Sequence, residues 1–314
     1  MSSSRPREGP AAAVGAPAPR WTGRSRRLEG PRIQPYLFVA PALLVISIFV
    51  LWPLAELFYL SLCRANILGR TRFTGLDNFL AVFTSLDFAN SVRATVIFMV
   101  VVVIAQSALA LVVALLVESE SRAMGALRTL YFLPVVIPFV VASFLWKFIY
   151  DPDVGLVNSI LQVLHLPRTG FLANPSQALG SLIVACIWKA WAFFTMIFLS
   201  GLKEIPRELY ECAAIEGATT GQRVRYVTLP LLRRVLLFVI VVTTMDSVAR
   251  VFTPVFVMTQ GGPRGVTDLL VYYDWRTAFR LGDIGFASAV AVFMFVFVLL
   301  INLVQLRVGR ERDA

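Results

Sequence analysis

Groups that could act in catalysis or metal binding are sparse in this chain of 314 residues. It has one histidine, His165, and three cysteines, Cys63, Cys186 and Cys212, which lie far apart. Their spacing matches no disulfide framework and no metal site built on paired histidines. The phosphate-binding pattern G-x-x-x-x-G-K-[ST] does not occur. The sequence therefore predicts a chain that is not an enzyme and holds no cofactor of its own.

Charged residues inside long apolar runs are the remaining groups that could take part in binding or chemistry. Asp246 and Arg250 share one apolar run, and Lys189 lies in another. A charge at the centre of a membrane helix costs about 2.5–3.5 kcal/mol on insertion scales, so it usually marks function. Asp246 and Arg250 are four residues apart and can pair on one helix face. They either form a self-satisfied ion pair beside a water-filled cavity or contact a solute.

Lys189 is flanked by two aromatic residues, Trp188 and Trp191. Aromatic faces stack on the apolar faces of sugar rings, and a cation can bind hydroxyl or phosphate groups. The alternative is a lysine at a helix interface that is packed by tryptophans. With Thr253, these residues and the Asp246–Arg250 pair form the predicted solute path.

A polar segment, residues 203–231, separates two of the apolar runs. Its stretch from Pro206 opens with proline and acidic residues, which is a good helix start. Gly217 and Gly221 interrupt the pattern, and a second helical stretch stops at Pro230. The segment is predicted to form two short helices around a glycine turn, a compact knob that a partner protein could grip.

At these residues the sequence resembles the transmembrane permeases of binding-protein-dependent ABC importers. Their loop is written E-A-A, three residues, G, nine residues, I-x-L-P. Cys212 replaces an alanine and Val227 replaces the isoleucine, both conservative in size. The positions assigned to this coupling loop are Glu211, Cys212, Ala213, Ala214, Gly217, Leu229 and Pro230.

Three further stretches resemble the maltose and glycerol-phosphate permease subfamily. Met258–Pro263 looks like its T-x-G-G-P turn, and Phe132–Pro134 with Trp146–Asn158 looks like its third span. The similarity runs from about residue 35 to residue 307. In that subfamily position 250 is often Gln or Asn and position 253 often Asp, whereas this chain has Arg250 and Thr253.

The resemblance implies a type I ABC importer permease (MetI-like) fold and a set of partners. These are a second permease subunit, two ATP-binding cassette ATPase subunits that bind ATP and Mg, and an extracytoplasmic solute-binding protein. The first loop helix would dock into a cleft of the ATPase, with Glu211 as the polar contact and Gly217 as the tight turn. The implied solute is a carbohydrate. The extra cation, Arg250, would also suit an anionic polyol such as sn-glycerol 3-phosphate.

The elements that must position these residues are membrane helices. The chain is 58% hydrophobic and 15% charged, and its apolar residues gather in runs longer than the roughly 20 needed to cross a bilayer. We expect an all-α integral membrane protein. Its six transmembrane helices are predicted at Pro35–Leu62, Val92–Val117, Leu127–Tyr150, Ala178–Leu202, Leu232–Met258 and Ile284–Arg307.

The distribution of Lys and Arg predicts the orientation. With the N-terminus inside, 18 of these residues lie on the cytoplasmic side and 8 on the other. This asymmetry favours both termini in the cytoplasm of a bacterial or archaeal cell, with the protein in the plasma (inner) membrane. Residues 1–34 are predicted to be a disordered basic tail, residues 35–307 the permease domain, and residues 308–314 a cytoplasmic tail. The net charge of +10 thus reflects topology and not nucleic-acid binding.

The sequence lacks the features of two other classes of membrane protein. A secondary transporter or channel subunit would show charge relays within its spans and inverted internal repeats. The sequence contains few such charges and no clear repeat. A membrane enzyme would need catalytic groups clustered at one membrane face, and none stand out.

Overall fold

The computed structural model describes residues 34–118 and 122–311, and it divides between Trp52 and Pro53 into two units. In the first unit, α1 (Gln34–Ile46) continues into a π-helical turn, η1 (Ser47–Leu51). Every side chain from Tyr36 to Trp52 is exposed. An apolar helix with no polar face suits lipid. Residues 1–33 of the predicted basic tail lie outside the described residues.

Among the residues that the structure describes, five helices are long and apolar enough to span a membrane: Tyr36–Ser61, Leu86–Leu116, Ala178–Lys203, Arg233–Thr259 and Ile284–Gly309. The first ends with α2 (Trp52–Ser61). The second is α4 (Leu86–Leu116), the third α8 (Ala178–Lys203), and the last is part of α15 (Ile284–Glu311). The remaining one joins α12 (Arg233–Ala249), α13 (Phe252–Pro254) and η3 (Val255–Thr259). The predicted spans are confirmed at all five places, although α4 begins six residues before the predicted Val92.

The remaining predicted span, the third along the chain, is broken. Residues 127–150 form α5 (Arg122–Val136) and α6 (Phe139–Ile149), which are bent by 103° at the intervening residues. Pro138 explains the break, because it lacks an N–H and disfavours helical geometry at Ile137. Pro134, by contrast, stays inside α5. The prediction of one helix across residues 127–150 is therefore corrected to two helices.

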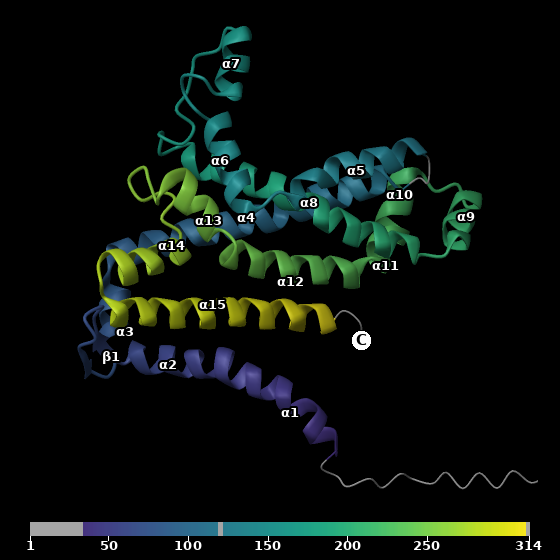
Figure 1. The fold of residues 1–314 in the computed structure, drawn as a ribbon. Helices are drawn as coiled ribbons and strands as arrows, with labels where there is room; N and C mark the ends of the chain where they lie inside the picture. The colour runs from purple at the N-terminus through teal and green to yellow at the C-terminus, as the bar shows by residue number, and fades with distance from the viewer. Residues whose placement is uncertain (1–33, 119–121, 312–314) are drawn as a thin grey trace, which may run out of the picture. The chain divides into compact units, whose positions relative to one another are not determined.

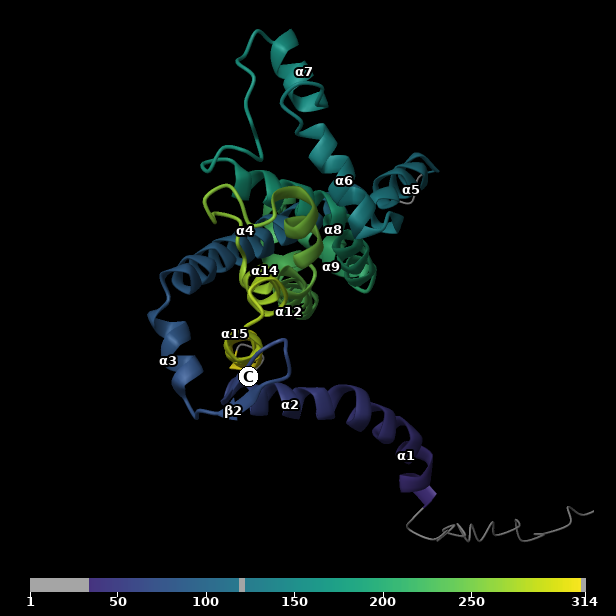
Figure 2. The same ribbon diagram turned by 60° about the vertical axis from the view of Figure 1, so that its left-hand side comes forward.

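Within the second unit, α4 packs on both α8 and α12, and α12 packs on α15. Figure 1 shows these four helices running alongside one another, and Figure 2 gives the same arrangement after rotation. Small residues of α4 face large aromatic ones of α8: Ala110 and Ala114 share a buried cluster with Phe194 and Phe198. Small side chains let membrane helices approach closely.

Within the described ranges, a short hairpin departs from the all-helical prediction. Strand β1 (Cys63–Ala65) pairs antiparallel with β2 (Thr71–Phe73), with Cys63 opposite Phe73. The buried Asn78 of α3 (Asp77–Thr84) donates to the carbonyl oxygens of Ser61 and Cys63, at 2.9 and 2.8 Å. These bonds fix the turn that follows α2.

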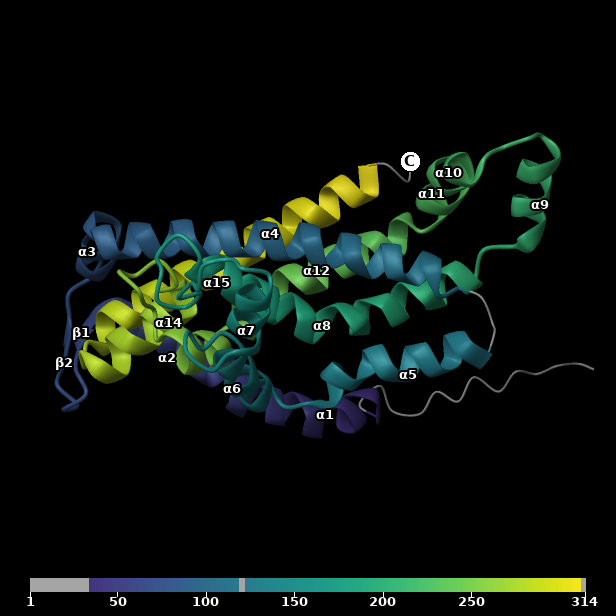
Figure 3. The same cartoon turned by 90° about the horizontal axis from the view of Figure 1, so that it is seen from above.

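The remaining helices lie in the connections between the spans. α7 (Leu156–Val163) follows the broken third span, and α14 (Leu270–Trp275) with η4 (Arg276–Arg280) precedes α15. The predicted loop 203–231 holds α9 (Arg207–Ile215), α10 (Thr220–Arg223), η2 (Val224–Thr228) and α11 (Leu229–Leu231). Figure 3 shows α9 and α10 at one end of α4 and α8, and α3 and α14 at the other end.

Candidate functional site

The predicted knob in the segment 203–231 consists of α9, the glycine turn behind it and α10. Pro206 precedes α9, and Glu208 lies in its first turn, where a negative charge suits the helix dipole. Gly217 ends the helix with φ +79°, a left-handed conformation that favours glycine. Its N–H donates to Ala214 and the next N–H, of Ala218, donates to Ala213, at 3.0 and 2.9 Å. This is the Schellman arrangement of a helix C-terminus.

The second helix of the knob has its own cap. The Thr219 hydroxyl accepts from the backbone N–H of Gln222, and the Gln222 side chain accepts from the backbone N–H of Thr219. Such a capping box satisfies two free N–H groups at a helix start. Gly221, which we predicted to interrupt the helix, lies inside α10 instead. The φ of Gly221 is not positive, so the left-handed residue Gly217 is sufficient to turn the chain from α9 into α10.

No residue of α9 is buried in the described chain. Glu211 and Cys212 are exposed, and Ile215 exposes 87% of its surface. At its base the knob is held firmly, because the Tyr210 hydroxyl lies 3.0 Å from the hydroxyl of Thr228, which is buried. An apolar residue exposed on a rigid, capped helix is suited to contact with a partner.

Leu229 and Pro230 begin α11, the short helix that joins the knob to the fifth span. Leu232 follows them and is buried in the cluster that also contains Phe198 and Leu202 of α8. The knob is thus connected directly to two membrane helices. The predicted residues Glu211, Cys212, Ala213, Ala214, Gly217, Leu229 and Pro230 all lie on this continuous path.

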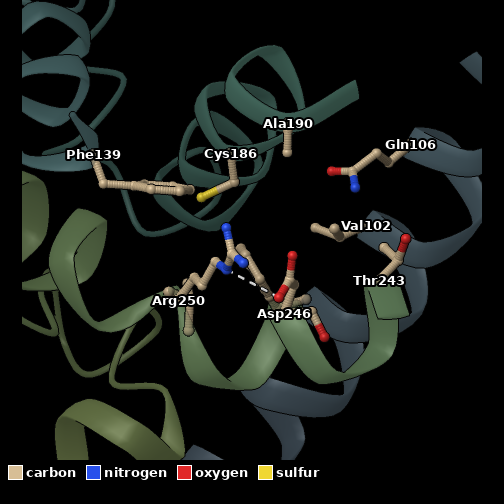
Figure 4. Close-up of a pocket in the computed structure, with 11 residues that line it drawn as sticks. Val102, Gln106, Phe139, Cys186, Ala190, Thr243, Asp246 and Arg250 are labelled. Atoms are coloured by element: carbon tan, nitrogen blue, oxygen red, sulfur yellow. Dashed lines mark ion pairs between the residues drawn. The ribbon is translucent and has the colours of Figure 1, made fainter. Parts of the chain in front are cut away.

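A small cavity lies midway along the spans, between α4, α6, α8 and α12 (Figure 4). We call it the Asp246 cavity. Its volume is about 50 Å³, which is room for a few waters only. The Nε atom of Arg250 lies 3.0 Å from Oδ1 of Asp246. The walls of the Asp246 cavity are formed by Phe98, Val102, Gln106, Phe139, Cys186, Ala190, Thr243, Asp246, Ser247, Arg250 and Val251.

The structure brings Asp246 and Arg250 together as predicted and adds polar residues that the sequence analysis missed. Gln106 of α4 and Thr243 and Ser247 of α12 are buried and line the same cavity. The sequence alone could have identified Gln106, because it is an amide within an uncharged run of a membrane helix. It could not have identified Thr243 and Ser247, since Ser and Thr are common in such helices.

Lys189 lies apart from that pair. Its ammonium donates to the backbone carbonyl of Val135, 3.1 Å away, and stands 4.9 Å from the centroid of the Phe139 ring. The break at Pro138 deprives the Val135 carbonyl of its helical partner, the N–H of residue 139. Lys189 therefore satisfies the end of a broken helix.

The two predicted tryptophans also face elsewhere. Trp188 packs edge-on against Trp146, with ring centroids 5.6 Å apart, and Trp191 packs against Tyr131 at 5.2 Å. Thr253 is half-buried in α13 and does not line the Asp246 cavity. Of the six residues of the predicted solute path, the structure gathers only Asp246 and Arg250 around this cavity.

Comparison with known proteins identifies the family. Residues 106–312 match the family described as "Binding-protein-dependent transport system inner membrane component". The chain belongs to this family. Membership confirms the resemblance seen at Glu211–Pro230. It also makes the chain an integral inner-membrane transport component, as predicted.

Curated relatives of this permease cover nearly its whole length. It is 35% identical over 278 residues to the trehalose/maltose transport system permease protein MalF of Thermococcus litoralis, covering 88% of this chain and 94% of the relative. It is 32% identical over 286 residues to the sn-glycerol-3-phosphate transport system permease protein UgpA of Agrobacterium fabrum, covering 90% and 96%.

A solved structure shares the fold of this permease. A chain of a bacterial ABC transporter involved in the import of the acidic polysaccharide alginate superposes with a TM-score of 0.80 at 23% identity, covering 88% of this chain and 95% of that chain. A bacterial alginate ABC transporter in complex with an alginate pentasaccharide-bound periplasmic protein superposes with a TM-score of 0.79 at 23% identity, covering 88% of this chain and 94% of that chain. The likeness confirms the predicted MetI-like fold of an ABC importer permease.

Proposed function

We propose that this permease forms half of the solute path of an ATP-driven importer for a carbohydrate. The importer part of the proposal rests on α9, the first helix of the knob. This helix is exposed, is joined to the fifth span and presents a surface that an ATPase can bind. The curated relative MalF, named for trehalose and maltose, supports the carbohydrate part. The Asp246 cavity also supports it, because the negative charge of Asp246 offsets the positive charge of Arg250 and leaves a site suited to a neutral solute.

The proposal requires a set of partners. Six spans are too few to enclose a path, so a second permease subunit completes it. Two ATPase subunits bind ATP and Mg, and an extracytoplasmic solute-binding protein delivers the solute. This chain contributes no cofactor and no catalytic group. Both termini and residues 203–231 lie on the cytoplasmic side, in keeping with the distribution of Lys and Arg.

Movement would pass from the ATPase to the solute path through rigid elements. A shift of α9 acts on Thr228 through the Tyr210 hydroxyl, and Leu232 transfers it into the cluster at the start of α12. From Leu232 to Asp246 the chain advances 14 positions, mostly in α12, which is about 21 Å at 1.5 Å per residue. A rigid helix of that length would transmit a displacement at Leu232 to the Asp246 cavity.

An anionic polyol such as sn-glycerol 3-phosphate is the second candidate solute. The side chain of Arg250 is 63% exposed, so its guanidinium can turn toward an incoming anion. Asp246 argues against it, because the carboxylate would repel a phosphate at the same cavity. Neutral sugars meet no such repulsion.

The experiment is ATP-driven uptake by the chain reconstituted in proteoliposomes with its second permease, its ATPase and its binding protein. Labelled maltose, trehalose and sn-glycerol 3-phosphate are the probes. The proposal predicts uptake of a neutral sugar that vanadate stops and that Glu211→Ala uncouples from ATP hydrolysis. Uptake that resists vanadate and collapses with an uncoupler would instead make the protein a secondary transporter.

A further inference from the structure

A polar cavity lies at the end of α4 that is remote from α9. We call it the Asp268 cavity. Its volume is about 340 Å³, against about 50 Å³ for the Asp246 cavity, and small-molecule sites typically measure 300–1,000 Å³. Asp87 and Ser91 lie at the start of α4, whereas Val112 at its other end lines a groove beside Tyr210. The 31 residues of α4 separate these ends by about 46 Å.

Residues of three elements line the Asp268 cavity, namely α4, the loop between η3 and α14, and η4. They are Asp87, Asn90, Ser91, Gln260, Gly261, Gly262, Arg264, Gly265, Asp268 and Arg276. An adjoining cavity of about 420 Å³ shares Asn90, Arg264 and Gly265, so the space extends toward the start of α8. Its additional wall includes Ile97, Leu179 and Val266, which could pack against the apolar face of a further ring.

Three buried polar atoms of the lining have no hydrogen-bond partner among the described residues: Ser91 Oγ, Asp268 Oδ1 and Arg276 Nε. Ser91 is 1% exposed and Asp268 is 8% exposed. Buried polar groups are nearly always hydrogen-bonded, and leaving one unpaired is costly. The residues that carry these atoms all line one space, so a hydroxyl, a carboxylate and a guanidinium group stand beside it, and a polyhydroxylated molecule carries the donors and acceptors that match them.

The charges of the lining balance. Asp87 and Asp268 oppose Arg264 and Arg276, and an Arg276 guanidinium nitrogen donates to Asp268 Oδ2 at 2.8 Å. An anion entering this space would face two carboxylates, and a cation would face two guanidinium groups. A neutral ligand that both donates and accepts hydrogen bonds is free of either repulsion.

The rim of the cavity is held in shape before any ligand arrives. Gly261 has φ +81°, and a Cβ atom there would lie 3.3 Å from Asp268 Oδ1. The Thr267 hydroxyl donates to the Gly262 carbonyl at 2.6 Å, and the backbone N–H of Leu270 donates to the Thr95 hydroxyl on α4 at 2.8 Å. Preorganised polar groups bind without the cost of ordering a loop.

We propose that the Asp268 cavity is a binding subsite for a neutral, polyhydroxylated solute such as a sugar, occupied while the Asp246 cavity is closed. This inference rests on the proposed function, since it assumes that the solute path carries a carbohydrate. The subsite holds the solute at the end of the bundle opposite the knob. Opening of the spans then transfers it to Asp246 and Arg250.

The test uses the full-length chain in lipid nanodiscs and saturation-transfer NMR with maltose, trehalose or sn-glycerol 3-phosphate as the probe. Asn90→Trp fills the cavity from an exposed position, and Asp268→Asn removes one balancing charge. Asp153→Asn, a change of the same charge at an exposed residue outside the cavity lining, is the matched control. We expect saturation transfer to a neutral sugar that falls at least fivefold in Asn90→Trp and persists in Asp153→Asn.

Three results would overturn the inference. The first is a sugar signal that survives Asn90→Trp, the second is a sugar signal that is lost only in Asp246→Asn, and the third is a signal confined to sn-glycerol 3-phosphate. If Asp268→Asn fails to fold, Asn90→Trp still decides. Uptake by the reconstituted importer separates this inference from the proposed function: sugar uptake without contact at the Asp268 cavity refutes the subsite alone. Contact without uptake supports the subsite and refutes the importer.

Discussion

The ammonium group of Lys189 donates a hydrogen bond to the backbone carbonyl of Val135, with 3.1 Å between nitrogen and oxygen. The two residues belong to different membrane spans, α8 and α5. Lys147 of α6 does the same for Val257 in η3, at 3.2 Å. Each lysine thus satisfies a carbonyl near an irregular helix end, which explains how a charged side chain is accommodated inside an apolar helix.

Replacing Lys189 with methionine should destabilise the bundle. The Val135 carbonyl would lose its partner, and an unsatisfied buried group costs about 1–3 kcal/mol. Thermal unfolding of the purified chain in detergent measures the loss. Lys189→Arg keeps a donor at the same position and should restore most of the stability. A methionine variant as stable as the wild type would mean that water or lipid headgroups satisfy the carbonyl instead.

Gly217→Ala should impair the knob, whereas Gly221→Ala should not. A Cβ atom meets nothing within 4 Å at either position, so only the backbone differs. Gly217 has φ +79°, which costs a non-glycine residue roughly 1–2 kcal/mol. Gly221 lies within α10, where alanine is favoured over glycine by about 1 kcal/mol. Circular dichroism and ATP-driven uptake check both variants, and equal losses at the two positions would refute the role of the turn.

Tyr210→Phe should loosen the joint between the knob and the fifth span. It removes the hydroxyl that lies 3.0 Å from Thr228 Oγ1 and changes little else. The hydrogen bond is worth about 0.5–1.5 kcal/mol. We expect the assembled importer to hydrolyse ATP with less solute moved per ATP. Tyr226→Phe, which alters an exposed tyrosine in the same segment, is the control. An unchanged ratio in Tyr210→Phe would show that this contact does not transmit motion.

The stability of the chain should depend on pH through Asp274, a residue that the sequence analysis did not single out. Burial raises the pKa of this carboxyl from 3.8 to about 7. The folded state then binds the proton more tightly than the unfolded state does, so stability falls as pH rises from about 4 to about 7 and levels off above. Asp274→Asn should flatten that slope in thermal unfolding across this range. An identical slope in the variant would contradict a buried, neutral carboxyl.

Much of the fold follows from the sequence because a bilayer demands long apolar helices. Span positions and the knob around Gly217 could be predicted in this way, since run length and glycine spacing are local signals. The 103° break at Pro138 could not be predicted fully, because proline permits anything from a mild kink to two separate helices.

The candidate site was harder to predict than the fold. The pairing of Asp246 with Arg250 followed from their spacing on one helix face. Lys189 and its two tryptophans were assigned to the same path, yet their contacts depend on where α5 and α6 turn, which no local pattern encodes. The grouping of Ser91, Asp268 and Arg276 joins segments far apart in the sequence, so only the tertiary structure reveals it.

The native cysteines provide the most direct test of the central claim, that α9 couples this permease to an ATPase. Cys212 on α9 is exposed, whereas Cys63 and Cys186 are buried. A thiol-directed cross-linker applied to the assembled importer should join Cys212 to the ATPase subunit, and Cys212→Ala should abolish the product. Labelling of Cys212 from outside intact cells, or cross-linking to the solute-binding protein instead, would contradict the account.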